Sequence, residues 1–168
     1  GDQNDVVLTP RYITDLMARL ADVDRNSYVW DWALGSGGFL ISAMNLMLQD
    51  NKRNATSDDE RLTKDELIKS TQLLGVEKLP DIYILAVLNM ILMNDGSTNI
   101  INENSLTEYN GKYAYNKNEE FPANVFLLNP PYSADGNGMI LVQKAFEKMK
   151  GGKGAVIIQD SAGTGKAS

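Results

Sequence analysis

The chain alternates between segments in which apolar residues recur at helical spacing and short runs that are apolar throughout. In the segment LTPRYITDLMARLADV this spacing predicts a helix over residues 9–22, with Thr9 as its cap and Pro10 in its first turn. The same spacing recurs three times, so we expect further helices over residues 38–49, 80–93 and 138–150.

Short apolar runs between these helices predict five strands. Four of them are expected at residues 28–31, 72–77, 125–128 and 155–158, and a short one within 97–106. Strands that alternate with helices are typical of a doubly wound, mostly parallel sheet, so the pattern predicts an α/β, Rossmann-like fold in a single domain over 1–168. The polar stretch 51–66 is expected to form a surface loop whose end joins a helix before Leu67.

The composition limits the chemistry that is open to the chain. It has 168 residues with no histidine and no cysteine, which excludes His-based general bases, Ser-His-Asp triads, disulfides and zinc fingers, and we expect no metal site. The net charge of -6 argues against strong autonomous binding to nucleic acid, so another subunit or domain would have to hold such a substrate. No segment has the ~20 apolar residues of a membrane span, and none resembles a signal peptide; we expect a cytoplasmic protein without a membrane partner.

A glycine loop follows the first expected strand, in the stretch DWALGSGG. Gly35 and Gly37 allow a sharp turn and a close approach to a ligand, and the helix behind them offers unpaired N–H groups. Asp31, just before this turn, suits a cofactor that carries a positive charge. The dinucleotide-binding pattern would require glycine at Leu40, so hydride transfer is disfavoured. A tight turn that binds nothing is the alternative interpretation.

An acidic residue, Glu77, ends the second expected strand. In nucleotide-binding sheets of this kind, a carboxylate at that place accepts hydrogen bonds from ribose hydroxyls. Its separation from the glycine loop exceeds the usual ~20 residues, which the polar stretch 51–66 can account for. A solvated charge at the end of a strand explains Glu77 equally well.

The stretch NVFLLNPPYS places an asparagine, two prolines and a tyrosine directly after an apolar strand. The side-chain oxygen of Asn129 and the carbonyl of Pro130 are acceptors on a stiff loop, because prolines fix φ and have no N–H. Two such acceptors can hold an amino group, and accepting both of its protons localises the nitrogen lone pair. Tyr132 can stack on the base that carries this amino group. The alternative is a proline turn without a catalytic role.

Four segments in this order resemble a known family. They are LTPRYITDLMARL, WDWALGSGGFL, GVEKLPDIYILAVLNMILM and NPPY, and they are similar to the S-adenosylmethionine-dependent adenine-N6 DNA methyltransferases, specifically the modification subunit of type I restriction-modification systems. The resemblance covers most of the chain. It implies the class I methyltransferase fold, S-adenosylmethionine as cofactor, and DNA as the methylated partner.

The resemblance also implies roles for individual residues. Asn129, Pro130, Pro131 and Tyr132 match the amino-group clamp. Asn104 stands where the family has an acidic residue that touches the cofactor's adenine, and Trp32 and Leu34 replace proline or small residues. The positions expected beside the cofactor are Thr9, Pro10, Asp31, Gly35, Ser36, Gly37, Gly38, Phe39, Glu77 and Asn104.

Within the family, the fold is a seven-stranded sheet with a C-terminal antiparallel hairpin, and the subunit carries a helical N-terminal domain. With about five strands expected, the chain resembles the catalytic core of a longer protein whose last strands are missing. We expect residues 28–108 to form the cofactor half and 121–160 the half that holds the target amino group. The resemblance further implies partner restriction and specificity subunits, the latter reading the DNA sequence.

Three functions stay open at this stage. The first is methyl transfer from S-adenosylmethionine to adenine N6 in DNA by a site-specific methyltransferase, with the base flipped out of the duplex. The second keeps the clamp but changes the substrate to a protein glutamine or to RNA. The third is a non-catalytic module for cofactor binding or assembly. Cofactor affinity separates the third from the other two.

Overall fold

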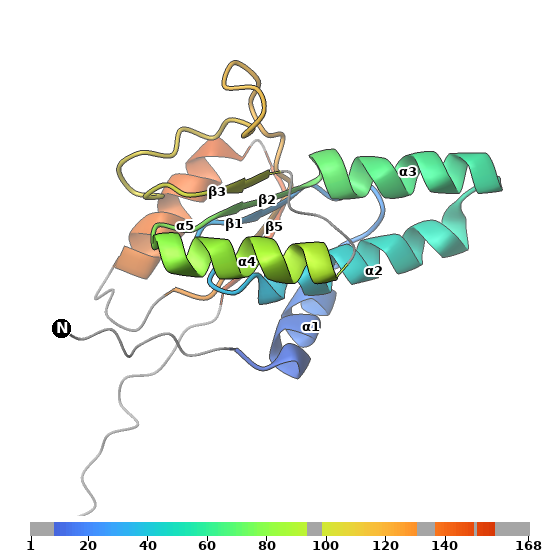
Figure 1. The fold of residues 1–168 in the computed structure, drawn as a ribbon, viewed down its shortest axis with the longest axis horizontal. Coiled ribbons are helices and arrows are strands. Elements are labelled where there is room, and N and C mark those ends of the chain that lie inside the picture. The colour runs from blue at the N-terminus through green and yellow to red at the C-terminus, as the bar shows by residue number, and fades with distance from the viewer. Residues whose placement is uncertain (1–8, 94–98, 131–136, 150, 157–168) are drawn as a thin grey trace, which may run out of the picture.

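A parallel five-stranded sheet forms the centre of the computed structural model, which describes residues 9–93, 99–130, 137–149 and 151–156 (Figure 1). The strands lie in the order β3-β2-β1-β4-β5, and every adjacent pair is parallel. This confirms the predicted Rossmann-like α/β fold. The strand bounds are β1 (Val29–Asp31), β2 (Leu73–Val76), β3 (Ile100–Ile101), β4 (Val125–Leu128) and β5 (Lys153–Val156).

Helices cover both faces of the sheet. Side chains from α1, α2, α3 and α4 pack on one face, and α5 packs on the other together with aromatic residues of the 109–121 segment. In Figure 1, α4 lies in front of the sheet and α5 behind it. The helix bounds are α1 (Arg11–Leu20), α2 (Gly38–Asn54), α3 (Asp58–Thr71), α4 (Pro80–Leu92) and α5 (Asn137–Lys148). None of these described helices is both long and apolar enough to cross a membrane.

The central strands are buried on both faces, which explains why their residues are apolar without alternation. Along β4, Val125 and Leu127 point to the face covered by α1 and α2, whereas Phe126 and Leu128 point to the aromatic face. All four side chains are buried. A parallel sheet with helices on both faces requires this pattern.

The prediction of a surface loop over residues 51–66 was wrong. Helix α2 continues to Asn54, and α3 begins at Asp58. The sequence signal for this helix start is a capping box. The Ser57 hydroxyl accepts from the Glu60 N–H at 3.1 Å, while the Glu60 carboxylate turns back and accepts from the Thr56 hydroxyl. Three acidic residues in the first turn stabilise this helix start further.

The other boundaries agree closely with the sequence, with two differences in detail. Helix α1 has Pro10 as its N-cap and no side-chain cap, so Thr9 does not cap it as predicted. The fifth strand is described only to Val156, and the expected continuation to residue 158 lies outside the described residues.

Gly75 illustrates how tightly the loop after β1 packs against β2. A Cβ atom at this position would stand 2.7 Å from Leu34 Cδ1 and 2.9 Å from Leu40 Cδ1, both buried side chains. We therefore expect Gly75→Ala to lower the free energy of unfolding by about 1 to 3 kcal/mol, the usual cost of overpacking. Urea unfolding of Gly75→Ala, Leu34→Ala and the double variant checks this. Strictly additive costs would contradict the predicted steric coupling.

Candidate functional site

The register of the sheet brings the predicted site residues to one edge. Asp31 ends β1 and pairs with Gly75 of β2 on one side and with Leu127 of β4 on the other. Because the strands are parallel, the residues that follow β2 and β4 emerge at the same edge as Asp31. Glu77 and Asn129 are those residues, and ligands bind at this edge in open α/β sheets.

Asp31 is fully buried and half unpartnered. Its Oδ1 accepts from the Ala33 N–H at 3.1 Å, while Oδ2 has no hydrogen-bond partner among the described residues. Burial raises the pKa of Asp31 to about 7; the Ala33 hydrogen bond opposes this rise and the negative charge of Glu77 adds to it. A buried carboxylate with one open oxygen lacks a cationic partner, which a ligand with a positive charge would supply.

The glycine loop after β1 has the open geometry of a binding cradle. Gly35 and Gly37 adopt φ angles of +57° and +91°, a backbone conformation that residues other than glycine rarely adopt. Apart from Gly35 and its two chain neighbours, no atom of the described residues lies within 4 Å of where a Cβ on Gly35 would stand. Helix α2 begins directly behind, at Gly38, so its first N–H groups lack intrahelical partners and face this loop.

Two side chains, one directly after β2 and one from α4, hold the loop in place. Glu77 Oε1 accepts from the Gly35 N–H at 3.0 Å, and its Oε2 accepts from the Leu79 N–H at 2.8 Å. Each oxygen keeps a second lone pair, which leaves room for a ribose hydroxyl. Asn89 donates from Nδ2 to the Ser36 carbonyl at 3.0 Å. The sequence interpretation missed Asn89, although a lone amide in an otherwise apolar helix was a usable signal.

The residues that depart from the family pattern do not fill the cradle. Leu34 is buried in the cluster under α2, and Trp32 is buried in the aromatic cluster on the opposite face. Asn104 Oδ1 accepts from the backbone N–H groups of Leu106 and Thr107, at 2.8 and 3.3 Å, so this oxygen shapes the turn after β3. A contact from Asn104 to a cofactor stays a prediction.

The clamp residues lie beside this loop, at the end of β4. Asn129 Nδ2 donates to the Thr9 hydroxyl, and Asn129 Oδ1 is buried without a partner in the described parts of the chain. A Cβ on Gly138 of α5 would stand 2.9 Å from Pro130 Cβ, so α5 begins in close contact with that proline. Pro131 and Tyr132 lie outside the described residues.

Comparison with known proteins gives the family. The family model "N-6 DNA Methylase" matches residues 2–161. The chain belongs to this family. Over 99% of its length it is 40% identical to the type II restriction enzyme and methyltransferase RM.BcgI of Heyndrickxia coagulans, of which it spans 25%.

Solved structures agree with the family on the fold. The N-6 DNA methylase chain matches the M protein of the type I restriction enzyme EcoKI with a TM-score of 0.70 and 22% identity, over 95% of this chain and 35% of that protein. A modification subunit of a type I restriction enzyme from Vibrio vulnificus YJ016 matches with a TM-score of 0.60 and 22% identity, over 93% and 34% of the two chains. The chain thus spans a quarter to about a third of the length of these three proteins.

Family and fold support S-adenosylmethionine as the cofactor, and the site fits it. This cofactor carries two positive charges, on its sulfonium and its amino group, and Asp31 Oδ2 is a buried acceptor that lacks a cation. The open space above Gly35 admits a ligand close to the backbone. Ser36 lies in the glycine loop and Gly38 begins α2, whereas Phe39 is buried in the core cluster and Pro10 is the exposed N-cap of α1. Contacts from these four residues to the cofactor stay predictions.

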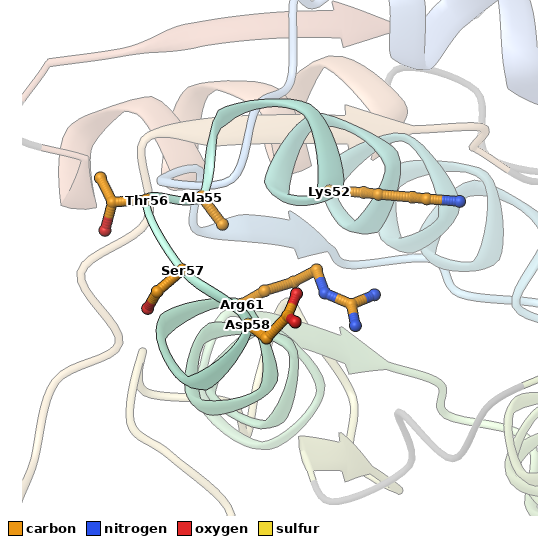
Figure 2. Close-up of a pocket in the computed structure, with 6 residues that line it drawn as sticks. All are labelled: Lys52, Ala55, Thr56, Ser57, Asp58 and Arg61. Carbon is orange, nitrogen blue, oxygen red and sulfur yellow. The ribbon is translucent and has the colours of Figure 1, made fainter.

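A second hollow of the surface lies away from this site. Figure 2 shows a pocket between the C-terminal end of α2 and the start of α3, with Arg61 beside Asp58 on α3 and Lys52 on α2. It is at the opposite end of α2 from the glycine loop. The negative charges in the first turn of α3 would repel an anion in this pocket. The described residues contain no cluster of three or more metal-ligating side chains, so a metal site is not indicated there either.

Proposed function

We propose that the protein to which this chain belongs transfers a methyl group from S-adenosylmethionine to the N6 amino group of adenine in DNA, within a restriction-modification system. The observation that carries the proposal is the buried, unpartnered Oδ1 of Asn129 at the same sheet edge as Asp31 and the glycine loop. Asp31, an acceptor for a cation, ends β1, and Asn129, an acceptor for an amino group, directly follows the adjacent strand β4. The family supplies the substrate class.

The chain's own residues perform the positioning that the reaction needs. Bound S-adenosylmethionine supplies an electrophilic methyl group on a sulfonium. Asn129 Oδ1 and the Pro130 carbonyl accept the two protons of the target amine, so the nitrogen lone pair leaves conjugation with the ring and points at the methyl carbon. Asp31 and the loop at Gly35 hold the charged methionine end, and Glu77 the ribose hydroxyls.

The amine gives up one proton after transfer, and the described chemistry needs no histidine for this. With S-adenosylmethionine bound, the held nitrogen would take the methyl group, and the sulfur would leave with the electron pair as a neutral thioether. The methylated nitrogen is then cationic and strongly acidic, so it loses its proton to solvent through the acceptors that hold it. This agrees with a chain of 168 residues that contains no histidine.

DNA recognition by a further part of the system completes the proposal. With a net charge of -6, the chain lacks the excess of basic residues that phosphate binding requires. We therefore propose that a specificity subunit or domain binds and reads the DNA, and that a restriction activity is associated with it, as both activities are combined in the restriction enzyme and methyltransferase RM.BcgI. The cytoplasm is the compartment that this substrate implies.

The test is methyl transfer by the full-length protein with its specificity component. We expect label from S-adenosylmethionine carrying a radioactive methyl group to enter duplex DNA, and digestion to nucleosides to return it as N6-methyldeoxyadenosine. DNA that already carries N6-methyladenine at the target should accept no label. Label recovered in RNA or in protein glutamine, with none in DNA, would contradict the proposed substrate, and cofactor binding without any transfer would indicate a non-catalytic module.

A further inference from the structure

The carboxamide of Asn129 has two chemically different ends, and its orientation decides what it can do. The oxygen accepts hydrogen bonds and the NH2 group donates them, but the two ends have nearly the same shape. Rotation of the amide about its terminal torsion is soft and roughly two-fold, so packing alone discriminates poorly between the orientations. A target amine needs the oxygen. A donating amine can select that end, but a further contact must hold the amide in place for it.

Thr9 is the group that contacts this amide. Its hydroxyl accepts a hydrogen bond from Asn129 Nδ2 across 120 positions of sequence. The contact occupies the donating end of the amide and leaves Oδ1 on the other side, buried and without a partner among the residues the structure describes. This is the orientation in which Asn129 can accept a proton of an amino group.

The Thr9 hydroxyl is available for this role and rigidly placed. It does not cap α1, whose N-cap is Pro10, so no helix N–H competes for it. Helix α1 behind it is fastened to α2: the hydroxyl oxygens of Thr14 and Ser42 lie 2.8 Å apart, and Ser42 donates to Asp15 at 2.5 Å. The segment that carries Thr9 is thus anchored to the helix that follows the glycine loop.

The second acceptor of the clamp is fixed by different means. Pro130 has a φ angle set by its ring, and close packing of Gly138 against that ring restricts it further. Its carbonyl cannot turn over in place as an amide side chain can. Of the two acceptors, Asn129 is therefore the one whose orientation depends on a neighbouring side chain.

We propose that Thr9 is a positioning residue that holds the Asn129 carboxamide in place, with its oxygen free for the target amine. This inference rests on the proposed function and assigns Thr9 a role toward the clamp in place of the cofactor contact expected from the family. Without the hydroxyl, the amide loses this contact and can swing about its side-chain torsions, so its oxygen is no longer held where the target amine donates. The rate of methyl transfer would fall.

The experiment compares three variants of the full-length enzyme with its specificity component. Thr9→Val keeps the shape and removes the hydroxyl, Thr9→Ser keeps the hydroxyl, and Thr71→Val is the matched control, since its hydroxyl donates only to the Leu67 carbonyl within α3. Single-turnover methyl transfer to a target duplex is measured at saturating cofactor, alongside the Kd for S-adenosylmethionine by calorimetry and the circular dichroism spectrum.

We expect Thr9→Val to slow transfer by about 10 to 100-fold, the effect of misplacing one positioning contact, with its Kd for cofactor within about twofold of the unmodified enzyme. Thr9→Ser should recover most of the rate, and Thr71→Val should not differ. A weaker cofactor affinity with an unchanged rate at saturation would overturn the proposal and make Thr9 a cofactor contact; equal rates in all variants would also overturn it. No transfer by the unmodified enzyme would instead contradict the proposed function.

Discussion

Asn129→Ala is expected to lower the rate of methyl transfer at saturating cofactor and DNA by about 10² to 10³-fold. The substitution removes a pre-organised acceptor that acts on charge developing in the transition state, and losses of this size are typical for such groups. The affinity for S-adenosylmethionine should stay within about twofold, because Asn129 follows β4 whereas the cofactor loop follows β1. Single-turnover kinetics and calorimetry on the full-length enzyme separate the two quantities.

Asn129→Asp is the matched control for this prediction. A carboxylate keeps an oxygen toward the target amine, and the Thr9 hydroxyl, which accepts from Asn129 Nδ2 in the structure, can donate to the other oxygen instead. We expect this variant to retain far more activity than alanine. An Asn129→Ala enzyme with the full rate would show that the amine is activated elsewhere, and the clamp would then be a structural turn only.

Asp31→Asn should have two effects of opposite sign. Removing the negative charge takes away the buried partner for the cationic cofactor, and we expect the Kd for S-adenosylmethionine to rise by about 100-fold, comparable to the ~3 kcal/mol of a charged hydrogen bond. The same substitution should stabilise the unliganded fold near pH 8. A pKa that changes from 3.8 to about 7 on folding corresponds to roughly 4 kcal/mol at pH values above both.

The sign of the pH dependence of stability follows from this raised pKa of Asp31. Between pH values of about 4 and 7 the folded chain holds a proton on Asp31 that the unfolded chain has lost, so this group's contribution to stability falls as pH rises through that window. The amide of the variant leaves one buried N–H unpaired, which costs about 1 to 3 kcal/mol. We therefore expect Asp31→Asn to raise the free energy of unfolding by about 1 to 3 kcal/mol at pH 8 and to give no gain at pH 4.

Urea unfolding of both proteins at pH 4, 6 and 8 measures these differences, and the comparison cancels the titration of other groups. Cofactor titrations over the same range should show affinity increasing with pH up to about 7, where Asp31 ionises in the unliganded protein. If the unfolding free energies of the two proteins differ equally at all three values, Asp31 does not titrate with a raised pKa. An unchanged Kd in the variant would remove it from the cofactor site.

Much of the site could be predicted from the sequence because its signals are local. Positive φ requires glycine at Gly35 and Gly37, an apolar run followed by Pro130 marks the end of a buried strand, and parallel strands place Asp31 and Glu77 at one edge. The same locality explains the error over residues 51–66, where charge was taken for a loop although Ser57 and Glu60 form a capping box.

The orientation of the Asn129 amide was beyond the reach of the sequence. In the structure its Nδ2 donates to a hydroxyl 120 positions away, and no periodicity or spacing connects the two residues. The burial that raises the pKa of Asp31 is likewise a property of packed neighbours, not of the DWALGSGG stretch itself. Local sequence patterns thus predicted Asp31 and Asn129 as acceptors. Tertiary contacts determine which of their side-chain oxygens lack a hydrogen-bond partner among the described residues.

The central place of β1 also sets the order in which the site can form during synthesis. Val29 pairs with Leu73 on one side and with Val125 on the other, so β1 has only one neighbouring strand until β4 has left the ribosome. The ribosome needs on the order of 10 s for the roughly 100 residues that separate β1 from β4. The glycine loop and Glu77 can assemble during that interval, whereas the Asn129 clamp cannot. A nascent chain therefore completes first the half that we propose binds cofactor, with one edge of β1 open to chaperones or to mispairing until β4 arrives.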